Sequence, residues 1–160
     1  MRAAATGLTL LLRAALGGIF LLSGLAKIAD PIAFLFSVRQ FRLLPGPLEA
    51  WLALVVPWLE FLLGLLLLSG LLYRTAALLI AALNVFFAFA ILTIVARGIE
   101  IDCGCFGLLA RVLPIPDQAD LTGVVRNLVF AGCGFFLFRQ ERSPLSLEGY
   151  LAGRGTGLSA

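Results

Sequence analysis

Cys103 and Cys105 are the residues whose type and spacing best suit covalent chemistry, because Gly104 alone separates them. Glycine tolerates backbone angles that other residues avoid, so it allows the sharp turn that brings two such close sulfurs together. The pair could then cycle between a dithiol and a disulfide. A ring this small is expected to be strained, and strained, exposed disulfides exchange readily. We interpret the two cysteines as a catalytic redox pair, in which one thiolate attacks a partner and its neighbour resolves the mixed disulfide.

Two plainer interpretations of Cys103 and Cys105 stay open. The pair could form an inert bridge that ties down its loop, or it could remain as two reduced, buried thiols. A bridge between residues two positions apart closes so short a loop that it adds little stability, which favours the redox interpretation. The third cysteine, Cys133, lies well inside a hydrophobic segment. We expect it to be a small buried apolar residue.

The composition is that of an integral membrane protein. Of 160 residues, 61% are hydrophobic and 13% are charged, with a mean hydropathy of +1.07. A soluble domain carries about 25% charged residues. The net charge of +3 is small and scattered, so we expect contact with the lipid bilayer and no binding of nucleic acid. The sequence contains no histidine, the ligand that haem b, most copper sites and most catalytic zinc sites use, so we predict no metal site.

Four hydrophobic stretches are each long enough to cross roughly 30 Å of hydrocarbon as helices. We therefore predict an all-α membrane protein, a four-transmembrane-helix bundle with a short interfacial helix between the first and second spans. The bundle forms a membrane domain over residues 1–140, and residues 141–160 are expected to be a flexible polar tail. The expected spans cover residues 7–28, 48–70, 75–96 and 121–138, and the interfacial helix covers residues 32–44.

The predicted interfacial helix is amphipathic. It places Phe34, Val38 and Phe41 on one side, and Arg39 and Arg42 on another. This pattern is typical of a helix that lies in the headgroup region of a bilayer.

One face of the first span carries a regular pattern. Arg13, Gly17, Phe20, Gly24 and Lys27 follow one another at steps of four and three, which places them on one side of a helix. Glycines on such a face permit close helix approach, so we predict that this face is the packed one. Lys27 either belongs to this packed face or extends to the membrane interface. Because Arg13 interrupts the apolar N-terminal run, we expect a retained span rather than a cleaved signal.

Glu60, Arg126 and Arg13 are ionisable residues inside the predicted spans, where a charge is costly unless it is paired. The second and fourth spans both begin on the side of the cysteine loop. Glu60 then lies about 16 Å and Arg126 about 7 Å below that surface, so we predict an ion pair between them. One interpretation makes the three residues a cofactor-binding site, as a polar cavity for a quinone headgroup or a proton path. The other is a salt bridge that specifies the bundle.

An even number of spans places both termini on one side of the membrane, and the cysteine loop with the interfacial helix on the other. We place the cysteine loop outside the cytoplasm, because redox pairs that become oxidised belong in an oxidising compartment. The positive-inside rule gives no orientation, because the basic residues divide evenly. Arg2, Arg74, Arg139, Arg142 and Arg154 lie with the termini, and Lys27, Arg39, Arg42, Arg97 and Arg111 lie with the loop.

Several of these patterns together resemble the methylamine-utilisation MauE family, within the broader DoxX-like membrane proteins. They are the first-span face followed by Pro31, the segment from Pro57 and Glu60 to Gly70 and Arg74, and the Cys-Gly-Cys-Phe-Gly loop at residues 103–107. The resemblance implies a four-helix bundle in the bacterial cytoplasmic membrane. It also implies a role in the periplasmic maturation of a disulfide-rich partner of methylamine metabolism, alongside a thioredoxin-like protein.

The expected arrangement is also similar in outline to quinone-linked disulfide-forming membrane enzymes of the DsbB and vitamin K epoxide reductase kind. Those enzymes use two surface cysteine pairs, whereas this sequence offers one, at Cys103 and Cys105. The likeness to these quinone-linked enzymes, rather than the number of cysteine pairs, makes a quinone the candidate cofactor.

Two functions from different classes follow. The first is a membrane component of thiol–disulfide redox chemistry, acting on a thioredoxin-like protein or a disulfide-rich extracytoplasmic client as a thiol–disulfide oxidoreductase or as its assistant. The second is a non-catalytic membrane scaffold, or a small subunit of a DoxX-type oxidoreductase complex, in which the cysteine motif serves as a turn. Either function is compatible with an oligomer.

Overall fold

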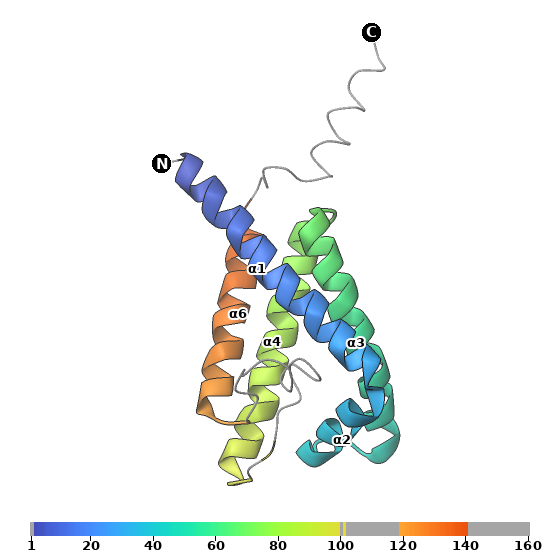
Figure 1. Ribbon diagram of the computed structural model, residues 1–160. Coiled ribbons are helices and arrows are strands. Elements are labelled where there is room, and N and C mark those ends of the chain that lie inside the picture. Colours follow the sequence, from blue (N-terminus) through green and yellow to red (C-terminus); the bar gives the residue numbers. More distant parts are fainter. Residues whose placement is uncertain (1, 100, 102–118, 141–160) are drawn as a thin grey trace.

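The computed structural model describes residues 2–99, 101 and 119–140, which are almost entirely helical (Figure 1). Four of the helices in this part of the chain are long and apolar enough to cross a membrane, and the fifth is a short helix between the first two of them. The predicted all-α fold class and the four-span arrangement are therefore confirmed. The helices are α1 (Arg2–Ala29), α2 (Pro31–Phe41), α3 (Gly46–Ser69), α4 (Tyr73–Ala96) and α6 (Leu121–Arg139).

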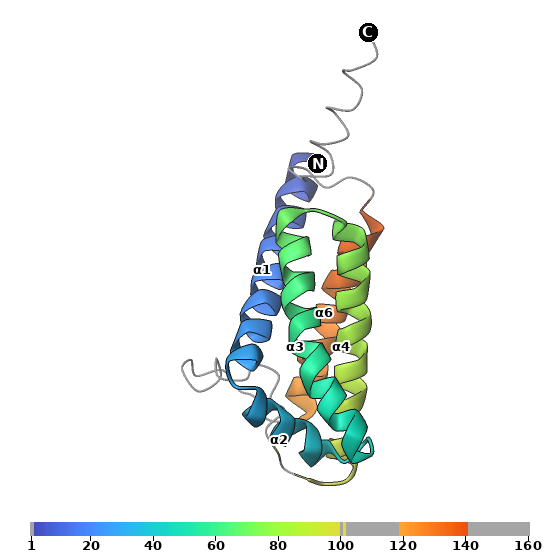
Figure 2. The ribbon, with the colours of Figure 1, turned by 90° about the vertical axis from the view of Figure 1, so that its right-hand side faces the viewer.

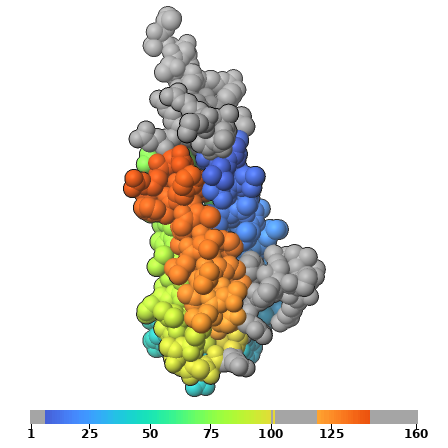
Figure 3. Space-filling model, turned by 90° about the vertical axis from the view of Figure 1, so that its left-hand side faces the viewer, coloured from blue at the N-terminus to red at the C-terminus, as the bar shows by residue number. Residues whose placement is uncertain are grey.

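The four long helices form two closely packed pairs, α1 with α3 and α4 with α6. The pairs join through contacts of α3 with α4 and of α1 with α6, and Figure 2 shows α3 between α1 and α4. On the opposite face, α6 lies between α4 and α1 (Figure 3). The start of α1 and the end of α6 lie at one end of the bundle, whereas α2 and the end of α4 lie at the other (Figure 1). Residues 97–99, 101 and 119–120, the described parts of the segment that holds the cysteine motif, thus lie at the same end of the bundle as α2, as predicted.

Local sequence signals begin and end these helices. Asp30 caps α2 by accepting a hydrogen bond of 3.0 Å from the Ala33 N–H, and Pro31 follows at the first helical position, where its missing N–H costs nothing. The helix ends three residues earlier than predicted, at Phe41. Gly70 ends α3 in the left-handed region at φ 73°, a conformation that glycine adopts without strain.

The packed face predicted for the first span is confirmed. A Cβ atom added to Gly24 would lie 2.6 Å from the backbone nitrogen of Phe61, and one added to Gly64 would lie 2.5 Å from that of Leu21. The backbones of α1 and α3 therefore touch, as small residues allow in membrane helix pairs. On the same face of α1, Arg13 and Lys27 are buried, with 4% and 1% of their surfaces exposed.

A hydrophobic core fills the middle of the bundle, whereas many large apolar side chains of the long helices are exposed. Leu67, Ile80 and Leu137 in the core are completely buried, and they come from α3, α4 and α6. Leu11, Trp51 and Phe89 each expose more than 60% of their surfaces. Helices that are apolar on all sides suit a bilayer, where hydrocarbon replaces water around the exterior.

Candidate functional site

A buried polar cluster joins α1 to α3. The ammonium Nζ of Lys27 donates to Glu60 Oε2 at 2.6 Å, to Glu60 Oε1 at 2.9 Å and to Ser23 Oγ at 2.7 Å. The Ser23 hydroxyl lies 3.3 Å from Glu60 Oε2, within hydrogen-bond distance. All three residues are at least 95% buried. Where no water is available, the attraction of the opposite charges and these short hydrogen bonds offset the cost of burying the two charges.

The sequence builds this cluster from two local patterns. Ser23 and Lys27 lie four residues apart on α1, so their side chains share one face of the helix. Gly24 lies between them and contacts the α3 backbone at Pro57 and Phe61, which brings Glu60 within reach. Lys27 also lies in the last turn of α1, where a positive charge is favoured by the helix dipole.

The predicted partner of Glu60 was wrong. Glu60 pairs with Lys27 rather than with Arg126. The physical reason is the order of the helices around the bundle, because α3 packs on α1 and α4, whereas α6 packs on α4 and α1. Arg126 is half-buried near the start of α6 and attracts the carboxylate of Asp120, the residue that caps this helix. Of the two alternatives that the sequence left open for Lys27, the structure shows the packed face, because the Lys27 side chain is 1% exposed and paired with Glu60.

Arg13 lies far from this cluster, at the other end of the α1–α3 pair. Lys27 follows Arg13 by fourteen positions, a rise of about 21 Å along α1. The Arg13 guanidinium donates to the carbonyls of Leu67 and Leu68 at 3.1 and 3.3 Å, and lies 5.7 Å from the centre of the Tyr73 ring. The carbonyls belong to the last turn of α3, so Arg13 satisfies acceptors that the helix itself leaves open. Arg13, Glu60 and Arg126, the predicted cofactor-binding residues, therefore do not meet at one place.

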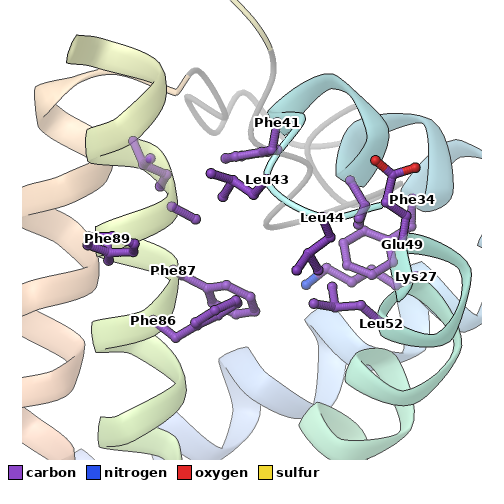
Figure 4. Close-up of a pocket in the computed structure, with 13 residues that line it drawn as sticks. Lys27, Phe34, Phe41, Leu43, Leu44, Glu49, Leu52, Phe86, Phe87 and Phe89 are labelled. Atoms are coloured by element: carbon purple, nitrogen blue, oxygen red, sulfur yellow. The ribbon is translucent and has the colours of Figure 1, made fainter. Parts of the chain in front are cut away.

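An apolar pocket of about 250 Å³ lies beside the cluster, between α4 on one side and α2 with the start of α3 on the other (Figure 4). Lys27 lines it, and Figure 4 shows the nitrogen of this side chain directed toward the space between the helices. Glu49 also lines the pocket, and its carboxylate is directed away from the space, with Oε2 3.8 Å from Arg39 Nε. Five phenylalanines also line the pocket, Phe34 and Phe41 from α2 and Phe86, Phe87 and Phe89 from α4.

The pocket adjoins the described ends of the cysteine loop. Phe41 and Ile91 both line it, and both also pack in a hydrophobic cluster with Ile94 and Ala119. The Ala119 N–H donates to the Ile101 carbonyl at 2.9 Å, which joins the two described ends of the loop. Arg97, the first residue after α4, donates to the Phe41 carbonyl at 3.2 Å.

Cys103 and Cys105, the predicted catalytic pair, lie outside the described residues, so their assignment stays a prediction. Cys133 lies on α6 and carries a free thiol that is half-buried against the core of the bundle, less enclosed than expected. Sequence reasoning placed Lys27 on the packed face of α1, but it missed that Lys27 forms both the ion pair with Glu60 and a wall of the pocket. Its spacing from Ser23 on the packed face of α1 was the available signal.

Comparison with known proteins identifies close relatives over most of the chain. The family model described as methylamine utilisation protein MauE matches residues 5–140. A methylamine utilization protein MauE of Methylophilus methylotrophus is 34% identical over 128 residues, which are 79% of this chain and 64% of that protein. A second, of Paracoccus denitrificans, is 38% identical over 150 residues, 93% of this chain and 77% of that protein. The chain thus spans less than two thirds of the first relative's length. No solved structure matches the chain.

Proposed function

The chain belongs to the MauE family of methylamine utilisation proteins, and from that membership we propose that it is a membrane component of thiol–disulfide redox chemistry. Cys103 and Cys105 carry the proposed activity, in a loop that lies between two membrane spans. The observation that supports this most is the spacing of the two cysteines in an otherwise apolar chain. The resemblance to DoxX-like proteins and to quinone-linked disulfide-forming enzymes points the same way.

The proposed reaction is an exchange of electrons between two dithiol–disulfide pairs. A thiolate of the client attacks the sulfur of one cysteine in the oxidised Cys103–Cys105 pair, and that bond breaks as a mixed disulfide forms. The second client thiolate then breaks the mixed disulfide, which leaves the client oxidised and Cys103 and Cys105 as thiols. The client loses two electrons and two protons, and the cysteine pair gains them.

The pair must be oxidised again before another cycle. A membrane quinone would supply this by accepting two electrons and two protons. The aromatic pocket next to the described ends of the cysteine loop suits such a ring-shaped, lipid-soluble molecule. Arg13, Glu60 and Arg126, the predicted cofactor-binding residues, do not lie together, so the proposal places the quinone at the pocket that Lys27 lines, next to Glu60.

We propose that the client is a thioredoxin-like protein or a disulfide-rich protein outside the cytoplasm. Disulfides form and persist in oxidising compartments, which favours a cysteine loop on the periplasmic side of a bacterial cytoplasmic membrane. The two relatives are named for methylamine utilisation, so the matching client would be a protein of that metabolism.

A second candidate function is a non-catalytic scaffold within a membrane oxidoreductase complex. The observation that favours it is the use of intramembrane charges for helix packing. Arg13 donates hydrogen bonds to carbonyls at the end of α3, and Glu60 forms an ion pair with Lys27. Under this proposal the cysteine motif serves as a turn, and variants that lose both thiols keep their function.

The test is the redox state of the cysteines in native membranes. An impermeant maleimide is applied before and after mild reduction, and the mass shift counts the thiols that become reachable. The proposal expects Cys103 and Cys105 to be oxidised, reducible and reachable from outside the cytoplasm. Substitutions Cys103→Ser and Cys105→Ser should each abolish client oxidation, whereas Cys133→Ser, on α6, serves as the matched control. Normal client oxidation in either loop variant would leave the scaffold as the better account.

A further inference from the structure

We propose that the pocket between α2, α3 and α4 is a binding site for a neutral, lipid-soluble quinone ring, with Lys27 as the hydrogen-bond donor to one ring carbonyl. This inference rests on the proposed redox function, and it deepens it by naming the site of the oxidant.

The walls of the pocket suit a flat conjugated ring. Five of the chain's 13 phenylalanines line it, and they come from both sides of the space in Figure 4. Aromatic rings bind another ring by offset stacking or by edge-to-face contact, in addition to the burial of apolar surface. An acyl chain would also be accommodated by an apolar wall, but it offers no flat face for these contacts.

The pocket is open toward the side of the bundle. Phe86 and Phe89 of α4 expose 43% and 62% of their surfaces while they also line the pocket. Both lie on a helix that is apolar enough to cross the membrane. Figure 4 shows the Phe86 ring at the space and the Phe89 ring on the far side of α4. A ligand dissolved in the bilayer could therefore reach the pocket sideways, past the exposed Phe86 ring, without crossing water.

The buried ion pair explains why the ligand should be neutral and carry an acceptor oxygen. Glu60 already balances the charge of Lys27, so an anion in the pocket would add an unpaired charge where such charges are costly. Both carboxylate oxygens of Glu60 lie within hydrogen-bond distance of the same nitrogen, at 2.6 and 2.9 Å. A shift of the longer contact to a ligand carbonyl would keep the ion pair and the Ser23 hydrogen bond.

The pocket lies next to the described ends of the cysteine loop, a position that suits an exchange of electrons between a bound quinone and the cysteines. Phe41 and Ile91 of its lining pack in the same cluster as Ala119, whose N–H holds the two described loop ends together. Two thiols that become a disulfide release two electrons and two protons, and a quinone that becomes a hydroquinone takes up the same number. The exchange therefore balances without a further reactant.

The test is photolabelling of the purified full-length chain in lipid nanodiscs by an azido-substituted ubiquinone, with the labelled peptides identified by mass spectrometry. We expect labels on the α2–α3 and α4 peptides, and we expect an excess of a short-chain ubiquinone to displace them. Leu44→Trp places an indole ring in the lining. It should raise the apparent Kd for ubiquinone about tenfold, because the indole occupies the space in which the quinone ring would stack. Leu48→Trp, at an exposed site outside the lining, is the matched control and should bind normally.

Three results would overturn the site. They are labels spread over all spans without displacement, equal loss of binding in Leu44→Trp and Leu48→Trp, or displacement by excess phospholipid as effective as by ubiquinone, which would assign the pocket to an acyl chain.

The same measurement on the Cys103→Ser/Cys105→Ser double variant separates this site from the proposed redox function. Binding that persists in this variant supports the pocket by itself, even if the cysteines prove inert in client oxidation. Active cysteines in a chain that does not bind ubiquinone would overturn the pocket and leave the redox function with another oxidant.

Discussion

Lys27 on α1 and Glu60 on α3 form an ion pair of 2.6 Å whose side chains are 1% and 3% exposed. Each charge is costly to bury alone, and together they make the α1–α3 contact specific as well as tight. The pair lies beside glycine positions where the two backbones touch. A change to either charge should therefore affect the packing of the bundle and the adjacent pocket together.

Lys27→Met is expected to lower the free energy of unfolding by about 3–5 kcal/mol, because it leaves the Glu60 carboxylate buried without its cation. The double variant Lys27→Met/Glu60→Leu should recover much of this loss. Denaturant unfolding in detergent, followed by circular dichroism, of the original chain, of Lys27→Met, of Glu60→Leu and of the double variant gives the four free energies of the cycle. A single variant as stable as the original chain would contradict the buried ion pair.

The Arg39–Glu49 pair provides the matched comparison. Its two atoms lie 3.8 Å apart and the Arg39 side chain is 53% exposed. Removing this pair by Arg39→Gln should change the free energy of unfolding by less than about 1 kcal/mol, since solvent weakens exposed ion pairs.

Gly24→Ala should weaken the bundle, whereas Gly18→Ala on the same helix should not. The new Cβ at position 24 would lie 2.6 Å from the Phe61 nitrogen, and backbone atoms cannot move aside without separating α1 from α3. At position 18 there is nothing within 4 Å, so alanine should stabilise the helix by up to about 1 kcal/mol through its higher propensity. Thermal unfolding of the two variants checks this. Equal melting temperatures would show that the α1–α3 contact is looser than described.

The spans and the packed face of α1 could be predicted because they depend on local patterns. Hydrophobic length indicates a span, and the steps from Arg13 to Lys27 indicate one helical face. The partner of Glu60 could not be predicted in the same way. Spacing within a helix shows which residues share a face, but the neighbour of that face depends on the order of helices around the bundle.

The pocket was hidden from sequence reasoning for a related reason. Its phenylalanines lie in two segments about 45 residues apart, one in α2 and one in α4, and hydrophobic side chains in a membrane protein are ordinary anywhere. The spacing along the first span predicts Lys27 on the packed face, but its role in the pocket lining depends on the position of α2 across the end of the bundle.

Arg13→Gln should destabilise the end of α3 without affecting the chemistry of the loop. It removes the guanidinium that donates to the Leu67 and Leu68 carbonyls and that lies over the Tyr73 ring. Hydrogen bonds from a charged donor contribute about 1.5–3 kcal/mol each, so a loss of this order is expected in the free energy of unfolding. Hydrogen exchange should quicken in the last turn of α3, while maleimide labelling of Cys103 and Cys105 stays unchanged. Altered cysteine labelling would instead support a cofactor role for Arg13.

Asp120 makes the start of α6 sensitive to acid. The pKa of this carboxyl is lowered, first because the Gly123 N–H donates to it at 2.8 Å, and further by Thr122 and by the charge of Arg126. A carboxyl whose pKa is lower in the folded state adds stability above its unfolded pKa, which is about 3.9, and this stability is lost as pH falls further through the folded value. Hydrogen exchange in the first turn of α6, measured relative to the intrinsic rate of an unfolded peptide at the same pH, should therefore be slow at neutral pH and should show an acid-dependent increase below about pH 4. Asp120→Asn keeps an oxygen for the cap but has no charge to titrate, so the same increase in this variant would show that the acid response comes from another group.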